Sequence, residues 1–435
     1  MLKSVPLPPS DRLTGRARSY AFPDLTPTAR DAIAAAAPRA HGLALSPEAL
    51  IAAARARTGL TEFGDAPLMG PLAALCASLN DELEFHALGR TYLYEQLVGI
   101  LATRLRFEAL WARRPEILEL PVERPIVIIG LPRSGTTILH RLLARDPAKR
   151  SSPFWEQVAP LPSGDPEAMQ PQPDPRIAQV QRSIDTLYAL APDLRQMHEV
   201  LVDEPDEDIS LLTFAFASLQ FEWSYRVPGY SAFYRAADHT EGYRYFRKVL
   251  QTLQWLRGGR RWVLKAPQHL EQLRPLLTAF PDATLVQTHR DPVSAVISLA
   301  SLTTYGCRRY FDHPNPHAIG GHIAAIVERL LRHGVDDRPP GDPRFVDIQF
   351  PDLVADPVGC VQRIYAAAGD ELSPEAEARM GAWIADNRQE KHGRHAYAAE
   401  DFALDVGDLR RRFDFYQQRF AIPADPRFAP PETAS

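Results

Sequence analysis

Apolar residues along the chain follow two kinds of pattern, and each predicts a different element. Short apolar runs rich in β-branched residues, bounded by glycine or charged residues, predict buried strands. These strands are expected at 126–129, 261–265 and 284–289. Apolar residues three and four positions apart predict helices behind the strands, at 136–144, 270–279 and 292–302. Because strand and helix alternate, we expect an α/β fold with a parallel β-sheet flanked by helices on both faces.

The remaining patterns divide the chain into three parts. Residues 1–120 are expected to form an arm over the surface, to about residue 40, and then an N-terminal helical subdomain. Residues 121–420 are expected to form the α/β domain, with a mostly helical insertion at about 160–256. Prolines crowd both termini, and residues 421–435 predict an extended C-terminal tail.

The most informative segment is Pro125–Thr137, which joins the first strand to its helix. Gly130 and Gly135 bound a loop, and the free amides of the first helical turn point into it, which makes an anion cradle. The spacing nearly fits the nucleotide-binding loop G-x-x-x-x-G-K-[ST], so the predicted sheet is P-loop-like. Thr136 replaces the lysine that reaches the terminal phosphates of a nucleoside triphosphate, and Arg133 supplies the positive charge instead. The loop therefore predicts a phosphate-type ligand on a different nucleotide.

Three sequence blocks resemble those of sulfotransferases that use 3′-phosphoadenosine 5′-phosphosulfate (PAPS). Pro132–Thr137 resembles their 5′-phosphosulfate loop. Residues 286–298 resemble their 3′-phosphate motif, in which an arginine ends a strand and a serine follows eight residues later, here Arg290 and Ser298. Residues 344–369 resemble the strand-turn-helix near the end of bacterial members. The order of the blocks also matches, so the chain resembles a PAPS-dependent sulfotransferase of bacterial type.

The resemblance implies in-line transfer of a sulfuryl group from PAPS to an acceptor hydroxyl. It also implies which residues hold the donor: Arg133, Ser134, Gly135, Thr136, Thr137, Arg290 and Ser298. Cytosolic members wrap the 3′-phosphate with a basic, glycine-containing loop near the C-terminus. Segment 388–397 is also basic, contains a glycine and lies late in the chain, so Arg394 is a candidate for this contact by position and composition, without a motif match. Lys265, at the carboxyl end of its strand, corresponds to the lysine that stabilises the departing oxygen. Arg133 is the second candidate for balancing transition-state charge.

Two residues are candidates for the base that accepts the acceptor's proton. Glu156 lies about twenty residues after the loop, where tyrosylprotein and heparan-type sulfotransferases place their catalytic glutamate. His198 is the second candidate, because histidine as a residue type suits proton abstraction from a hydroxyl near neutral pH. The histidine that cytosolic members place two residues after the strand lysine is replaced here by Pro267. The alternative for Glu156 is a structural role as a salt-bridged or helix-capping residue, and the alternative for His198 is a structural role within the fold.

An acidic run at 203–208 suggests a metal site at first sight. It precedes an apolar helix expected at 209–221, so N-terminal capping and interaction with the helix dipole are the favoured interpretation. No metal ion is expected, because the donor is not a triphosphate.

Aromatic residues are dense between 214 and 246, within the predicted insertion. They indicate either a pocket for a small apolar or aromatic alcohol, with the insertion on the acceptor side, or the insertion's own core. The sequence leaves both open.

Composition excludes some partners. The 435 residues are 45% hydrophobic and 24% charged, as in ordinary globular proteins, and the net charge of −5 disfavours a nucleic-acid partner. No apolar run is long enough to span a bilayer, and no signal sequence is evident. Three widely spaced cysteines indicate neither a disulfide framework nor a metal knuckle. We expect a cytoplasmic protein with a small-molecule acceptor; a homo-oligomer is left open.

Two alternatives belong to other functional classes. A P-loop kinase or nucleoside triphosphatase predicts a lysine after Gly135 and an acidic metal ligand at a strand end, whereas Thr136 and Lys265 stand at these places. A catalytically silent nucleotide-binding scaffold would keep the binding motifs and lack turnover, and the undecided base leaves it open.

Overall fold

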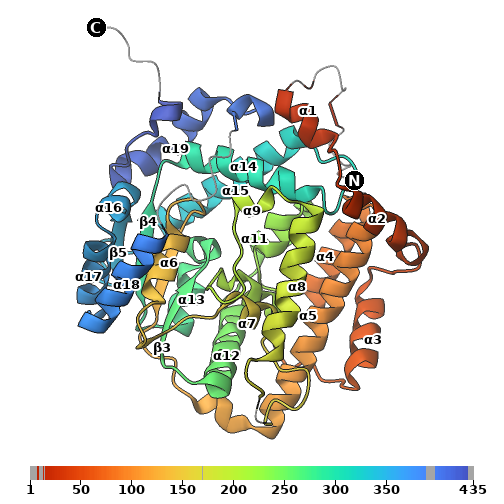
Figure 1. Ribbon diagram of the computed structural model, residues 1–435, viewed down its shortest axis with the longest axis horizontal. Helices are drawn as coiled ribbons and strands as arrows, with labels where there is room; N and C mark the ends of the chain where they lie inside the picture. Colours follow the sequence, from red (N-terminus) through yellow and green to blue (C-terminus); the bar gives the residue numbers. More distant parts are fainter. Residues whose placement is uncertain (1–6, 9–12, 14, 169, 388–396, 430–435) are drawn as a thin grey trace.

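A five-stranded parallel sheet forms the centre of the computed structural model, which describes residues 7–8, 13, 15–168, 170–387 and 397–429 (Figure 1). The strand order is β2-β3-β1-β4-β5, and every pair is parallel. The strands are β1 (Ile126–Gly130), β2 (Lys149–Arg150), β3 (Arg261–Lys265), β4 (Thr284–His289) and β5 (Phe345–Gln349). The predicted α/β class with a parallel sheet is confirmed, and the predicted bounds of β3 and β4 agree with the structure.

Helices cover both faces of the sheet, and the side chains of β1 alternate between the two faces. Ile126 and Ile128 pack into a smaller core with one group of helices, while Val127 and Ile129 belong to the larger core on the other face. The helices of the smaller core are α6 (Thr136–Leu143), α16 (Phe350–Ala355), α17 (Pro357–Ala368) and α18 (Pro374–Asp386). Those of the larger core include α12 (Thr240–Arg257), α13 (Leu273–Ala279), α14 (Pro292–Cys307) and α15 (Pro316–Asp336).

The N-terminal part is helical from Gly15 onwards. Its helices are α1 (Gly15–Ala21), α2 (Pro27–Ala40), α3 (Pro47–Thr58), α4 (Met69–Asp81), α5 (Ala87–Arg113) and η1 (Pro115–Glu119). Residues 1 to about 40 were predicted as an arm, and within the described part of this segment residues 15–40 contain the helices α1 and α2. Thr26 accepts a hydrogen bond from the Ala29 amide and Pro27 occupies the first turn, a start signal for α2 that the proline pattern obscured. Figure 1 shows α2–α5 on the side of the molecule away from α16–α18.

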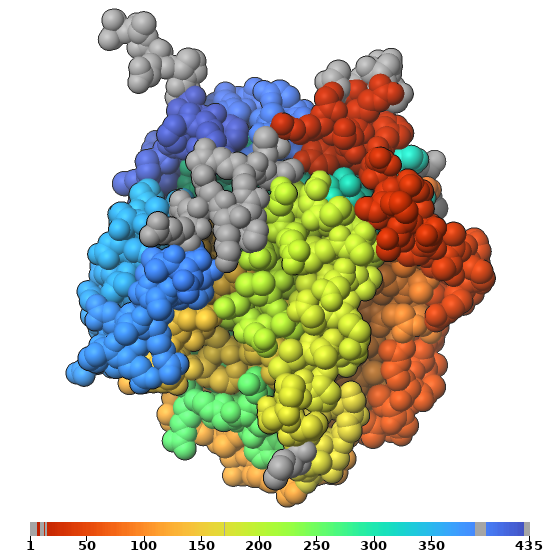
Figure 2. Space-filling view, viewed as in Figure 1, coloured from red at the N-terminus to blue at the C-terminus, as the bar shows by residue number. Residues whose placement is uncertain are grey.

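The insertion lies between these two groups of helices. The segment predicted as the insertion, about 160–256, contains α8 (Pro175–Leu190), α9 (Leu194–Met197), η2 (Asp208–Ala215), α10 (Gln220–Ser224), α11 (Pro228–Ala236) and nearly all of α12, and α7 (Phe154–Val158) precedes it. Figure 2 shows it, in yellow to green, across the middle of one face. The single helix predicted at 209–221 is wrong: a 3₁₀ helix ends where Phe216 adopts a left-handed conformation with φ of 52°. The Ser218 hydroxyl then bonds the Ile209 carbonyl at 2.7 Å and closes the turn.

The C-terminal region returns to the sheet. It contains η4 (Ala399–Phe402), α19 (Val406–Phe420) and η5 (Pro426–Phe428). The remaining 3₁₀ helix named here, η3 (Pro267–Glu271), lies earlier in the chain, directly after β3. The described part of the tail is tied to the start of α14. The Asp425 amide donates to Asp291 at 2.7 Å, and Arg410 bonds both carboxylate oxygens of Asp291 at 2.8 and 2.7 Å. Over the described ranges, no helix has both the length and the apolar content that a membrane span requires.

Candidate active site

The carboxyl edge of the sheet brings the sequence motifs together. β1 lies between β3 and β4, so the loop after β1 has Lys265 on one side and Arg290 on the other. Ligands of open parallel sheets bind at this edge. The first two sequence blocks therefore meet although about 150 residues separate them.

The loop after β1 is held open by backbone conformation and by one buried hydroxyl. Gly135 has φ of 90°, and a Cβ there would lie 2.8 Å from Leu353 Cδ2. Ser134 is buried, and its hydroxyl bonds the Leu131 carbonyl at 2.5 Å and Thr288 Oγ1 at 2.7 Å. The Ser134 side chain thus fastens the loop to β4, while α6 begins without a side-chain cap. The amides of its first turn stay available to an anion.

Arg133 and Arg290 connect the two predicted phosphate sites. Arg133 adopts φ of 72°, a rare conformation for a residue with a side chain, and its Nη1 donates to the Met197 carbonyl at 3.1 Å. Arg290 Nη1 donates to the Arg133 carbonyl at 2.6 Å. Burial lowers the pKa of both guanidinium groups. Two desolvated cations in contact with one loop favour an anionic ligand.

The 3′-phosphate candidates lie at the start of α14, beneath the C-terminal tail. Ser298 is buried two turns along this helix from Arg290. The tail places Asp425 at 3.8 Å from Arg290, and Arg427 Nη2 at 3.1 Å from Ser294 Oγ. Arg394, the predicted contact from the basic loop, lies outside the described residues.

A cavity of about 280 Å³ opens beside the loop. Of the predicted site residues, it brings together Arg133, Thr136, Thr137 and His198. The rest of its lining is Pro132, Phe154, Gln157, Asp206, Glu207, Ile209, Ser210, Gln220, Trp223, Leu299 and Leu302. The imidazole therefore faces the space next to the anion cradle.

A charged network supports His198. Its Nε2 lies 3.4 Å from Asp206 Oδ2, and Lys265 Nζ lies 3.5 Å from Asp206 Oδ1 and 3.3 Å from Glu207 Oε1. Burial alone would raise the pKa of Asp206, but the facing His198 and Lys265 hold that pKa below its ordinary value. The Asp206 carboxylate is thus available to orient the imidazole. Lys265 does not line the cavity, and its ammonium lies against these two carboxylates.

The capping role predicted for the acidic run is wrong. Glu207, at the start of η2, makes no side-chain cap, and it contacts Lys265 instead. Glu204 forms an ion pair with Arg145. Asp208 is buried and accepts the Lys265 amide at 2.5 Å, and burial raises the pKa of its carboxyl to about 8. Asp206, Glu207 and Asp208 of the run therefore contact Lys265 at the end of β3.

The structure does not bring Glu156 to the cavity. Both carboxylate oxygens accept hydrogen bonds of 2.6 Å from Arg150 Nη2, and Ser152 Oγ donates at 2.9 Å. Arg257 lies 3.6 Å away. The carboxylate is 1% exposed, so its environment is that of a buried structural ion pair.

Most of the aromatic residues belong to the larger core, which the insertion shares with the N-terminal helices and the sheet. Those buried in the larger core are Phe214, Phe216, Phe221, Tyr225, Tyr230, Tyr234, Tyr243, Tyr245 and Phe246. Trp223 lines the cavity. Trp223 belongs to the aromatic set for which the sequence left a pocket wall open, whereas Asp206 was not assigned to the site from the sequence. An acidic residue eight positions after His198 was the available signal for Asp206.

Comparison with known proteins places the chain in a family. The sequence profile of the sulfotransferase family matches residues 125–374, more than half of the chain. This chain belongs to the sulfotransferase family. The matched range contains Arg133, His198, Lys265 and Arg290, so the motifs and the cavity belong to the family domain. The assignment sets aside the kinase alternative.

Solved structures agree over nearly the whole fold. The sulfotransferase STF9 from Mycobacterium avium is similar with a TM-score of 0.75 and 28% identity, over 87% of this chain and 97% of that one. The sulfotransferase STF1 from Mycobacterium tuberculosis gives a TM-score of 0.71 and 30% identity, over 85% of this chain and 98% of that one. Their coverage extends the likeness beyond the range of the family profile.

One curated relative carries a name that specifies its acceptor. The Mycobacterium bovis protein named omega-hydroxy-beta-dihydromenaquinone-9 sulfotransferase Stf3 is 26% identical over 298 residues. The match covers 64% of this chain and 71% of that protein. In the described part of this sulfotransferase, no three His, Cys, Asp or Glu residues are grouped so that they could hold a metal ion.

Proposed function

We propose that this sulfotransferase moves the sulfuryl group of PAPS to an acceptor hydroxyl. The observation that carries the proposal is the shared cavity, in which His198 faces the phosphate-type loop at Arg133, Thr136 and Thr137. A loop that binds an anion and a base beside it are the two parts that this transfer needs.

The residues at the sheet edge fit the donor. The amides that begin α6 and the Arg133 guanidinium would hold the 5′-phosphosulfate, and Gly135 leaves the loop free of a Cβ. Arg290 and Ser298 would hold the 3′-phosphate. When bound, PAPS supplies a sulfur that gains a bond to the acceptor oxygen and loses its bond to the bridging phosphate oxygen, with adenosine 3′,5′-bisphosphate as the leaving group.

His198 accepts the acceptor's proton in this proposal. Asp206, 3.4 Å from Nε2, orients the ring and stabilises the imidazolium that forms. Lys265 balances the carboxylates of Asp206 and Glu207. We favour His198 over Glu156 because Glu156 is enclosed by Arg150 and Ser152.

The acceptor in this proposal is a hydroxyl on an apolar or aromatic molecule. Part of the cavity lining is apolar or aromatic, and it includes Trp223, Phe154, Leu299 and Leu302. The relative named for an ω-hydroxylated menaquinone supports the same acceptor chemistry.

Calorimetric titration tests the donor assignment. Adenosine 3′,5′-bisphosphate is expected to bind more tightly than ADP or ATP in metal-free buffer. Loss of the 3′-phosphate contacts in Arg290→Ala is expected to weaken its binding at least about tenfold, with a smaller loss for Ser298→Ala. A preference for ATP, or equal binding of the bisphosphate and ADP, would contradict the assignment.

A further inference from the structure

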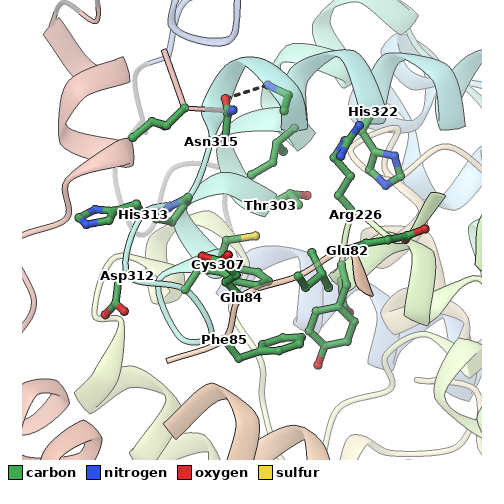
Figure 3. A pocket seen from close by; sticks show the side chains of 18 of the residues that line it. Glu82, Glu84, Phe85, Arg226, Thr303, Cys307, Asp312, His313, Asn315 and His322 are labelled. Carbon is green, nitrogen blue, oxygen red and sulfur yellow. Dashed lines mark hydrogen bonds between the residues drawn. The ribbon is translucent and has the colours of Figure 1, made fainter. Parts of the chain in front are cut away.

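A second cavity, of about 470 Å³, lies next to the candidate active site (Figure 3). Its walls come mainly from the connection between α4 and α5, the end of α10, the second half of α14, the connection between α14 and α15, and the start of α15. The volume is in the range of sites that enclose small organic molecules. No step of the proposed transfer uses it.

The floor of this cavity is aromatic and apolar. Phe85 stacks on Phe311 with ring centroids 5.1 Å apart and meets Tyr225 edge-on at 6.0 Å. Leu83 and Ile319 extend the apolar surface. Such a surface binds hydrocarbon or aromatic groups through exclusion of water and ring contacts.

Polar side chains stand around this apolar floor. Figure 3 shows Asp312 and His313 on one side of the cavity and Arg226 and His322 on the other, with Cys307 between them. His322 is held by the Glu222 carbonyl at 2.9 Å. The arrangement of an apolar interior with a polar margin is that of a pocket for an apolar ligand.

Trp223 is shared by the linings of this cavity and the active-site cavity. It is half-buried and lines both. The two cavities also follow each other along α14: Leu299 and Leu302 line the first, and Thr303 and Cys307 line the second. A molecule extended along α14 past Trp223 would therefore occupy both.

We propose that the second cavity holds the apolar body of the acceptor, while its hydroxyl reaches His198 in the first cavity. The acceptor is then an elongated apolar alcohol with the hydroxyl at one end, and Trp223 determines specificity at the junction. This inference rests on the proposed function, because it assigns the first cavity to the transfer. A short alcohol fits the first cavity alone, so the second cavity matters only for long acceptors.

Two substitutions on one helix separate this proposal from a general effect of mutation. Ala318 lines the second cavity on α15, whereas Ala325 is exposed on the same helix and lines neither cavity. Ala318→Trp is expected to lower kcat/KM for 6-phenylhexan-1-ol at least about tenfold and to change that for benzyl alcohol by less than about twofold. Ala325→Trp should leave both values unchanged. Thr303→Phe fills the cavity from α14 and should reproduce the Ala318→Trp pattern.

A measurement of acceptor binding tests the second cavity without requiring sulfuryl transfer. 6-Phenylhexan-1-ol, titrated calorimetrically into the purified protein, is expected to bind the wild type and Ala325→Trp and to lose at least about tenfold in affinity with Ala318→Trp. Circular dichroism verifies that each variant is folded. Binding with this pattern in a protein that transfers no sulfuryl group would leave the pocket standing and sink the proposed function. Equal binding by Ala318→Trp and wild type, or no binding by wild type, would overturn the pocket.

Discussion

Charged side chains near the site lie in buried or partly buried clusters in which cations contact carboxylates. Lys265 lies within 3.5 Å of Asp206 and Glu207, and Asp206 also faces His198. Burying the ammonium without these carboxylates would be costly. His198 lines the same cavity as the loop residues Arg133 and Thr136. Glu156 belongs to a different charge group, centred on Arg150.

Glu156→Gln is expected to affect stability far more than catalysis. The amide would leave Arg150 without its carboxylate in a buried place, and loss of such a pair destabilises by roughly 3 kcal/mol. Urea unfolding measures that loss. At temperatures where the variant is folded, kcat should stay within about threefold of wild type. A large fall in kcat with unchanged stability would instead make Glu156 the base.

Asp208 gives the stability a pH dependence of known sign. Its pKa is about 8 in the folded protein, because of burial, and about 3.9 in an unfolded chain. The folded protein therefore keeps this proton while the unfolded chain loses it, so the stability contribution falls as pH rises from about 4 to 8. Asp208→Asn should remove this decline.

Thermal unfolding between pH 5 and 8 checks the Asp208 prediction. The unfolding temperature of Asp208→Asn, relative to wild type, should rise by roughly 2–4 °C from the low to the high end of this range. Parallel curves for the two proteins would show that Asp208 does not titrate there.

The loop between β1 and α6 depends on backbone conformation at the level of the element. Gly135→Ala forces a side chain into a left-handed residue with Leu353 and Phe350 within 3.0 Å of the new Cβ. The loop amides should then shift, and affinity for adenosine 3′,5′-bisphosphate should fall at least about tenfold. Calorimetric titration measures it.

Gly99→Ala is the matched control for Gly135→Ala. Gly99 lies within α5, and a Cβ there would meet nothing within 4 Å. Its affinity for the bisphosphate should be unchanged, with a small gain in stability of about 0.5–1 kcal/mol. Equal affinity in both variants would show that the loop does not hold the ligand.

Elements buried on both faces were predictable from the sequence, and elements shaped by distant contacts were not. Arg261–Lys265 has three apolar residues between two charged ones, and Thr284–His289 is rich in apolar and β-branched residues; their strands have these bounds. The prediction of one helix at 209–221 is wrong because Phe216 adopts a left-handed backbone conformation, and tertiary packing overrides the local helical preference there. The start of α2 was not predicted, because the surrounding prolines indicated irregular structure, although Thr26 and Pro27 are ordinary signals for the start of a helix.

The site shows the same division between local and distant information. The loop residues and Arg290 follow motifs and were named from sequence. The contact of Asp206 with Lys265 joins positions 59 residues apart, and no local pattern reveals it. The partner of Glu156 was closer to hand, since Arg150 precedes it by only six residues. Acidic side chains were assigned to a cap because the helix that they precede was predicted wrongly.

For the whole molecule, one buried arginine joins the N-terminal helices to the insertion. Arg104 of α5 is 0% exposed and donates to the carbonyls of Phe63 (2.8 Å), Ala66 (2.6 Å) and Phe214 (3.3 Å). Its guanidinium also lies 4.9 Å from the Tyr245 ring centre. The larger core is continuous from these helices to the sheet. We therefore expect the described parts of the chain to unfold together.

Arg104→Met is expected to lower the stability of the whole chain by roughly 3 kcal/mol, because three carbonyls lose a charged donor. Arg113→Met, on the exposed face of the same helix, should cost less than about 1 kcal/mol. Calorimetry should show one transition for both. A separate early transition in Arg104→Met would show that the N-terminal helices form an independent unit.

The most direct test of the central claim is sulfuryl transfer from ³⁵S-labelled PAPS to a panel of primary alcohols and phenols. Wild type should label at least one acceptor. His198→Gln should bind adenosine 3′,5′-bisphosphate normally and lose roughly 10²–10⁴-fold in kcat. Failure of the wild type to label any acceptor, despite tight bisphosphate binding, would identify a silent scaffold. Full activity in His198→Gln would contradict the assignment of the base.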